Sequence, residues 1–246
     1  MIQSKSAKRF EILAHIVMTL TTICIVLPFL LLFVSSVTSE TALVRDGYSF
    51  FPKELSFNAY GFILKNASNV FRAYGITIIV TVAGTLLNVV LSALLAYPLS
   101  LKNLPGRRVI SFYIFFTMLF NGGLVPTYLM YTGIFHINNT LYAYIIPGFL
   151  MSAMNVMMIR TFFENSLPDA LFEAAQIDGA TQPQIFVQIV LPLGKPILVA
   201  MGLLAGLGYW NDWTNGLYYV RDTQLYGIQN LLKYFTKGIA LGAVKG

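Results

Sequence analysis

The sequence has few charged residues and almost no cysteine or histidine. Asp, Glu, Lys and Arg make up 11% of the 246 residues, whereas 57% are hydrophobic. Soluble globular chains are usually about 25% charged and about 45–50% apolar, so this composition excludes an ordinary soluble domain and indicates a protein of the lipid bilayer. The one cysteine, Cys24, cannot form an intramolecular disulfide, and the two histidines, His15 and His136, belong to no metal-ligand cluster.

Motifs for enzyme chemistry are also missing. The sequence contains no G-x-S-x-G stretch for a nucleophilic serine, and His15 lies at the edge of an apolar run. Gly194-Lys195 matches the end of a phosphate-binding P-loop, but position 189 is Ile where that motif needs glycine. We therefore expect no catalytic residue, no metal and no cofactor on this chain. Its net charge of +6 comes from scattered basic residues beside apolar runs, which indicates topology markers and no nucleic-acid surface.

Five apolar runs have roughly the 20 residues that a helix needs to cross a membrane. They cover residues 12–36, 74–99, 109–131, 141–159 and 196–220. Glycines and prolines such as Gly84, Gly122, Gly123 and Pro126 lie within these runs and are expected at kinks and close helix contacts, because neighbouring helices can satisfy the freed backbone groups. We predict an all-α fold, a polytopic transmembrane helix bundle that forms a single domain over residues 1–246.

The orientation of the bundle follows from Lys and Arg near the ends of the runs. The amino-terminal segment and the loops 100–108 and 160–195 carry them, whereas the short loop 132–140 carries none. The longer loop 37–73 carries four, but long loops discriminate less. Because cytoplasmic loops hold an excess of positive charge, we predict a cytoplasmic amino terminus, which places residues 166–192 in the cytoplasm as well.

Residues 166–192 have the pattern of a helical hairpin. "SLPD" is typical of a helix start, with Ser166 as the cap and Pro168 in the first turn. Gly179 is expected to end this helix in the left-handed conformation. "TQPQ" then repeats the start signal, with Gln184 closing a capping box, and Pro192 is expected to end the second helix.

Such a hairpin has two interpretations. Its alanines and glycine would let the surface of a partner protein approach closely, which makes it a docking element. Alternatively, it is an amphipathic helix that rests on the membrane. Membrane-surface helices favour Lys and Arg on their polar face, and residues 161–194 contain neither.

The stretch "EAAQIDGATQPQIFVQIVLP" resembles the EAA loop of binding-protein-dependent permeases, the membrane subunits of ATP-driven (ABC) importers. The family pattern is E-A-A, three residues, G, nine residues and then I-x-L-P, and both spacings are kept here. The residues that match or flank the pattern are Glu173, Ala174, Ala175, Asp178, Gly179, Ala180, Ile189, Leu191 and Pro192. The resemblance implies that this loop is a coupling helix that fits a cleft on an ATPase subunit.

The resemblance also implies an assembly. A second homologous permease, two ABC ATPases that bind ATP and Mg, and an extracellular sugar-binding protein are the expected partners, together with membrane lipid and a sugar substrate in a bacterial cell membrane. The stretches "FNGGLVPTYLMYTGI", "WNDWTNGLYYV" and the terminal "GAVKG" resemble the carbohydrate-uptake subclass, near permeases for oligosaccharides. Tails of that subclass reach toward the ATPase dimer, which implies the same for Lys245 and Gly246.

The chain departs from the family in one respect. The resemblance implies six spans in the core topology, whereas five are visible, and no apolar run near 20 residues follows Val220. "NLLKYFTKG" reads as though a segment with the last span were missing between about Leu232 and Lys233. If the deletion is real, the alternative is a transport-defective membrane scaffold or a channel-like protein.

Polar and aromatic side chains near the spans suggest a sugar path. The candidates are Asn88, Asn121, Tyr209, Trp210, Asn211, Asp212, Trp213 and Asn215. Aromatic faces stack on sugar C–H surfaces and amides bind hydroxyl groups, while a charge such as Asp212 at a bilayer centre costs about 2.5–3.5 kcal/mol and so favours a functional role. The alternatives are an interfacial aromatic belt around Asp212, and hydrogen bonds between helices for Asn88 and Asn121.

Overall fold

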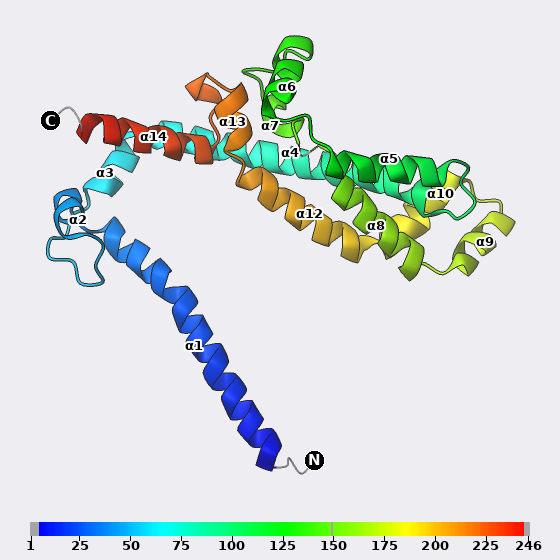
Figure 1. Cartoon of the computed structure of the whole chain (residues 1–246), viewed down its shortest axis with the longest axis horizontal. Coiled ribbons are helices and arrows are strands. Elements are labelled where there is room, and N and C mark those ends of the chain that lie inside the picture. The colour runs from blue at the N-terminus through cyan, green and yellow to red at the C-terminus, as the bar shows by residue number, and fades with distance from the viewer. Residues whose placement is uncertain (1–4, 149, 244–246) are drawn as a thin grey trace. The chain divides into compact units, whose positions relative to one another are not determined.

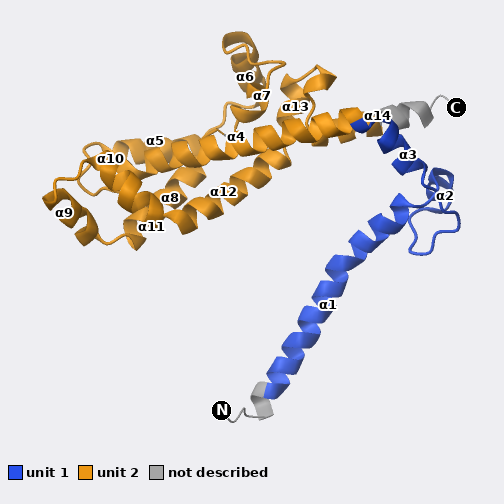
Figure 2. Ribbon diagram, turned by 180° about the vertical axis from the view of Figure 1, so that it is seen from behind, with its two compact units in different colours: residues 1–67 blue, residues 68–246 orange. Residues whose placement is uncertain are grey.

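The computed structural model describes residues 5–148 and 150–243, so Lys245 and Gly246, expected near an ATPase, lie outside the described residues. These residues divide into two compact units, residues 1–67 and residues 68–246, shown in blue and orange in Figure 2. Within the described part every regular element is a helix, apart from one isolated β-bridge between Thr38 and Leu55. The all-α prediction is confirmed.

Unit 1 contains α1 (Lys5–Ser36), α2 (Glu40–Asp46) and α3 (Asn58–Lys65). The helix α1 contains the first predicted span and ends at the same residue, and none of its most apolar 18-residue window is buried. A row of large apolar side chains this exposed would be unstable in water, so α1 is suited to lipid or to another membrane helix. After it, the side chain of Ser39 accepts a hydrogen bond from the Ala42 N–H and caps α2.

Unit 2 holds the remaining elements, coloured from cyan to red in Figure 1. Its longer helices are α4 (Ala67–Ser100), α5 (Arg107–Leu119), α8 (Ala153–Ser166), α9 (Asp169–Ile177), α12 (Lys195–Trp210) and α14 (Ile228–Ala243). Its shorter ones are α6 (Leu124–Leu129), η1 (Met130–Ile134), α7 (Tyr142–Ile145), α10 (Gln182–Ile185), η2 (Phe186–Val190), α11 (Leu191–Leu193), α13 (Thr214–Tyr219) and η3 (Thr223–Leu225). The helix α8 contacts both α5 and α12 (Figure 1).

Small residues bring α4 close to its neighbours. Ser92, Ala93 and Ala96 are buried on it, as is typical of helix contacts in membranes. Gly84 contacts α12 so closely that a Cβ atom there would lie 2.5 Å from Cζ of Tyr209. This bears out the expectation that Gly84 marks a close helix contact.

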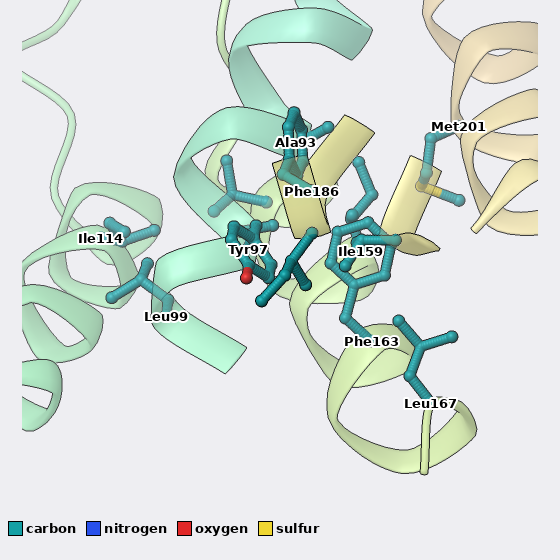
Figure 3. Packing of buried hydrophobic residues seen from close by; sticks show 13 residues of the cluster. Ala93, Tyr97, Leu99, Ile114, Ile159, Phe163, Leu167, Phe186 and Met201 are labelled. Atoms are coloured by element: carbon teal, nitrogen blue, oxygen red, sulfur yellow. The ribbon is translucent and has the colours of Figure 1, made fainter. Parts of the chain in front are cut away.

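The main core joins α4, α8 and the segment after α9. Figure 3 shows Ala93 and Tyr97 of α4, Ile159 and Phe163 of α8, and Phe186 gathered in one cluster. All of these side chains are buried, and the rings of Tyr97 and Phe186 have their centroids 5.2 Å apart. The cluster therefore anchors the second half of the predicted hairpin to the helix bundle.

Three of the predicted spans are not continuous helices. Residues 109–131 fall on α5 and on the α6–η1 pair, which is bent from α5 by 111° at the "FNGG" break. Residues 141–159 are interrupted between α7 and α8, and residues 196–220 are interrupted between α12 and α13. Glycine and proline at the first two breaks, including Gly123 with φ +86°, allow the chain to turn where an ideal helix would continue, whereas the third break, at residues 211–213, contains neither.

The described residues include two helices that are long and apolar enough to cross a membrane, α1 and α4, or up to four such spans if each bent pair counts as one. The second bent pair joins residues 182–193 to α12 at an angle of 77°. The count of five spans stays a prediction. Leu232 and Lys233, where a segment was expected to be missing, lie inside the continuous helix α14.

Candidate functional site

The predicted hairpin forms as two short helical segments joined at Gly179. The first is α9, and the second runs through α10, η2 and α11. Gly179 has φ +79°, the left-handed conformation that glycine adopts without strain, so its predicted role is confirmed. At the start of the second segment, the Thr181 N–H donates to Oε1 of Gln184 over 2.7 Å, which forms the predicted link of the capping box.

Two details of the hairpin prediction are wrong. Ser166 is the last residue of α8, and Pro168 occupies the cap position of α9 without a side-chain hydrogen bond. Pro192 does not end the second helix, because α11 continues through it to Leu193. The preceding π-helical turn Phe186–Val190 changes the hydrogen-bonding register just before Pro192, whose nitrogen cannot donate.

The hairpin has one anchored side and one exposed side. The Tyr97 hydroxyl donates to Oε1 of Gln182 over 2.6 Å, and Nζ of Lys102 lies 2.6 Å from Oδ2 of Asp169. Ala175, Ala180, Ile189 and Leu191 of the EAA pattern pack against the core as partly buried residues. Glu173, Ala174, Asp178, Gly179 and Pro192 are exposed.

The partly buried residues of the EAA pattern therefore fix the hairpin to the helix core, whereas the exposed residues face outward. Glu173 also borders a hollow of about 580 Å³ between α9 and the loop 100–105. Ile177, which the motif does not include, is 85% exposed at the end of α9. An isoleucine this exposed at the tip of a folded hairpin is suited to contact another protein, so it joins the candidate docking residues.

A second candidate site lies at the other end of α12. A cavity of about 450 Å³ is lined by three of the predicted sugar-path residues, Asn121, Asp212 and Asn215, together with Thr127 and Tyr218. The residues come from the break after α5, from α6, and from the region around α13. Segments far apart in the sequence thus converge on one cavity.

Hydrogen bonds hold these polar side chains in place. Oδ1 of Asp212 accepts from the N–H groups of Thr214 and Asn215 over 3.0 and 3.1 Å, which caps the first turn of α13. The side-chain amide of Asn215 donates to the Pro147 carbonyl over 3.1 Å, and Oδ1 of Asn121 accepts from the Gly123 N–H over 2.8 Å. Oδ2 of Asp212 is buried and has no hydrogen-bond partner among the described residues.

The remaining sugar-path candidates contribute to packing elsewhere. Oδ1 of Asn88 accepts from the amide of Asn155 over 2.9 Å, which links α4 to α8. The ring of Tyr209 packs on Gly84, and its hydroxyl donates to the Ile145 carbonyl over 3.1 Å. Asn88 thus makes the hydrogen bond between helices that was its alternative role, whereas Tyr209 is buried between helices.

Three further candidates do not line the cavity, namely Trp210, Asn211 and Trp213. Trp210 borders an apolar hollow between α4 and α12, and the amide of Asn211 donates to the Leu207 carbonyl over 2.9 Å. The ammonium group of Lys233 covers the ring of Trp213 in a cation–π contact. This face of the Trp213 ring is therefore covered by Lys233 and is not free to stack on a sugar.

Known proteins resemble this chain over most of its length. Protein LplC of Bacillus subtilis (strain 168) is 33% identical over 221 residues, which cover 90% of this chain and 74% of LplC. The polygalacturonan/rhamnogalacturonan transport system permease protein YtcP of the same organism is 32% identical over 224 residues, 91% of this chain and 77% of YtcP. This chain belongs to the permease subunits of carbohydrate ABC importers.

The fold of the permease agrees with that assignment. A crystal structure of a bacterial ABC transporter involved in the import of the acidic polysaccharide alginate matches with a TM-score of 0.81 and 31% identity, over 95% of this chain and 82% of that one. No family model matches the chain. The permease is an integral membrane subunit for ATP-driven sugar import and not itself an enzyme, and the comparisons favour this function over a defective scaffold or channel.

Besides Ile177 of the hairpin, sequence reasoning missed lining residues of the cavity, among them Tyr218 and Thr127. Tyr218 is not among the predicted sugar-path residues, yet it lines the cavity together with Asp212. Thr127 follows Pro126 in an apolar run and carried no polar pattern of its own. The break at Gly123 signals the bend, but the direction in which α6 then turns depends on tertiary packing.

Proposed function

We propose that the permease takes up an oligosaccharide through the cavity at Asp212 and is driven by an ATPase that docks on the hairpin Glu173–Pro192. The observation that carries this proposal is the convergence of Asn121, Asp212 and Asn215 on one cavity. Amide and carboxylate groups beside Tyr218 match the hydroxyl groups and C–H faces of a sugar. The proposed assembly contains a second permease, two ATPases that bind ATP and Mg, and an extracellular binding protein.

Charge restricts the sugar. The residues that line the cavity include the carboxylate of Asp212 but no Lys or Arg. The carboxylate of Asp212 would repel a uronate carboxylate, whereas a neutral sugar carries no charge that it could repel. We therefore infer that the part of the substrate held here is neutral, even though YtcP and the alginate transporter are named for acidic polysaccharides.

The coupling step is proposed to start at the hairpin. With the amino terminus in the cytoplasm, the hairpin faces the ATPases there. Closure of the ATPase dimer would move the exposed side of α9, and the packed side would transmit that movement to α4 and α8 through the shared core. The helix α12 follows directly at Gly194 and leads to the cavity. The bundle would thereby alternate between inward- and outward-facing states.

Uptake and ATP hydrolysis by the reconstituted importer test the coupling role. Glu173→Lys and Gly179→Asp are expected to leave the permease in the membrane but to abolish the ATP-dependent uptake of sugar. Asn58→Lys, which places a lysine on the exposed face of α3 in unit 1, serves as the control. Normal uptake by both hairpin variants would refute the coupling role.

The cavity needs a separate test. Asp212→Asn removes the charge while keeping the shape, and is expected to raise the KM for neutral oligosaccharides and to reduce discrimination against uronate oligosaccharides. Asn211→Ala, one residue away and outside the cavity, is the control. An unchanged preference in Asp212→Asn would rule out the carboxylate as a selectivity element.

We also propose that this sequence lacks a segment near residues 232 and 233, and that the missing segment contains the sixth span. The aligned part covers 74% of LplC, so about a quarter of that protein has no counterpart in the alignment. The intact mass of the permease, purified with its partners, tests this point. A mass several kilodaltons above the 27.4 kDa of the sequence would support a missing segment. A mass of 27.4 kDa would show that the purified chain lacks such a segment.

A further inference from the structure

A further cavity of about 580 Å³, separate from the hollow beside Glu173 and from the cavity at Asp212, lies at the start of α5 and is lined largely by cationic side chains. Lys102, Arg107, Arg108 and Arg160 line it, together with Leu104, Gly106 and Ser111. None of these lining residues is acidic. The cavity therefore has the charge of an anion-binding site, which neither candidate site above uses.

Nearby carboxylates only partly neutralise this cavity. Glu164 pairs with Arg107 and lies 3.5 Å from Arg160, while Asp169 pairs with Lys102. Four cations thus face two carboxylates, and Arg108 joins no ion pair among the described residues. The Nε atoms of Arg107 and Arg160 are buried and have no hydrogen-bond partner in the described part of the chain. With four cations against two carboxylates, the cavity has an excess of positive charge, which favours an anion through charge-assisted hydrogen bonds.

The first turn of α5 adds to the positive potential. Gly106 occupies the cap position with φ +75° and provides no side-chain acceptor. The positive end of the dipole of this 13-residue helix therefore lies at the cavity wall. Guanidinium groups and a helix amino terminus together form a typical environment for a phosphate group.

An exposed apolar surface begins at the next residue of α5. Val109 is 72% exposed, Phe112 66% and Tyr113 67%. These side chains belong to a run that is expected to cross the membrane, so the cavity lies at the level where the apolar core of a bilayer meets its head groups. A free phosphate ion would use only the cations, whereas a phospholipid would use both the cations and the apolar surface.

We propose that this cavity binds the phosphate head group of an anionic phospholipid, whose acyl chains lie along the exposed surface of α5. Arg107 and Arg160, which line the cavity, hold the phosphate through the charge of their guanidinium groups, and Arg108 adds a charge from the rim. The lipid would occupy the wedge between α5 and α8, next to the loop 100–105 that borders the hairpin.

Native mass spectrometry of the complete importer tests this proposal. The complex is purified through a tag on this chain and reconstituted in nanodiscs that contain phosphatidylglycerol and phosphatidylethanolamine. The readout is the number of phosphatidylglycerol molecules that remain bound after transfer to detergent. Because each cation near a membrane surface strengthens binding about fivefold, Arg108→Gln should reduce this retention about fivefold, and Arg108→Lys should restore it. Arg108 is exposed, so neither variant should disturb folding.

Further measurements test whether the retained lipid is bound in this cavity. Lys8→Gln with Arg9→Gln removes two cations at another membrane edge and should leave the retained lipid unchanged, whereas an equal loss in this control would refute a specific site. Displacement of the lipid by inorganic phosphate at millimolar concentration would show that the cavity takes free phosphate instead. If Arg108→Gln lost a protein subunit while keeping its lipid, the cavity would be a protein interface and the proposal would be wrong.

Discussion

Gly194 joins the hairpin to α12, and its replacement by alanine should destabilise the permease. The backbone there has φ −79° and ψ −2°, which alanine adopts without strain, so backbone conformation contributes no cost. The added Cβ atom, however, would lie 2.6 Å from Cε1 of Phe163 and 2.8 Å from the Val190 carbonyl oxygen. Both distances are well below van der Waals contact.

Neither neighbour can move away easily. Phe163 is buried in the core between α4 and α8, and the Val190 carbonyl accepts the Gly194 N–H over 2.7 Å. Overpacking of this kind costs about 1–3 kcal/mol. For a chain of this size, each kcal/mol corresponds to a fall of about 2–4 °C in Tm. The strain acts on the 77° bend between residues 182–193 and α12, so it should also change the angle at which the hairpin leaves the bundle.

Thermal unfolding of the purified importer measures this effect, and Gly75→Ala is a matched control. Gly75 lies inside α4, and a Cβ atom there would meet nothing within 4 Å. The same substitution should therefore stabilise the protein by about 0.5–1 kcal/mol, because glycine is unfavourable within helices. We expect opposite signs for the two variants. If Gly194→Ala matched or exceeded the wild-type Tm, the reasoning about the bend would be wrong.

Two further predictions concern Tyr209 and Glu164. Tyr209→Phe removes the buried hydrogen bond to the Ile145 carbonyl and should lower the free energy of unfolding by about 1–3 kcal/mol. The KM for sugar should stay unchanged in uptake assays. A raised KM would show that Tyr209 does belong to the sugar path. The hydrogen bond from Arg107 lowers the pKa of Glu164 in the folded protein. The ion pair therefore stabilises the protein fully at pH values above about 4.3, the pKa of Glu in the unfolded chain. This stabilisation is lost as the pH falls through the lower pKa that Glu164 has in the folded state. The difference in Tm between wild type and Glu164→Gln should narrow below about pH 4.3, and a constant difference would contradict this role for the pair.

Local signals predicted the hairpin well, because its structure is determined by residues close in sequence. Gly179 needs a left-handed backbone, and Thr181 with Gln184 satisfies the exposed N–H groups of the following turn without help from the rest of the chain. The error at Pro192 has a different origin. A proline normally ends a helix, but the π-helical turn before it changes the register, and this turn depends on Phe186 and Val190 being buried against α4 and α8.

Hydropathy predicted the cavity less well than the local sequence signals predicted the hairpin. It located the apolar runs but could not show that the segments 120–123 and 211–213 break their helices and converge on one cavity. Carboxylate, amide and aromatic side chains can all bind a sugar, so composition gave no reason to separate Asp212 from Trp213. Only the tertiary structure brings Lys233 over the ring of Trp213 and places Gly84 against Tyr209.

The helix α12 connects the two candidate sites and restricts how they can be coupled. Its 16 residues, from Lys195 to Trp210, span about 24 Å and separate the hairpin from the cavity residue Asp212. Gly202 and Gly206 lie against Val89 and Thr85 of α4, so little space remains for α12 to move alone. A movement of the hairpin must therefore either carry α4 and α12 together or be absorbed in the bend at Gly194. Because the hairpin is also fixed to α4 through Tyr97 and Gln182, the joint movement is favoured, and the proposed coupling would act on the packed helices as one body.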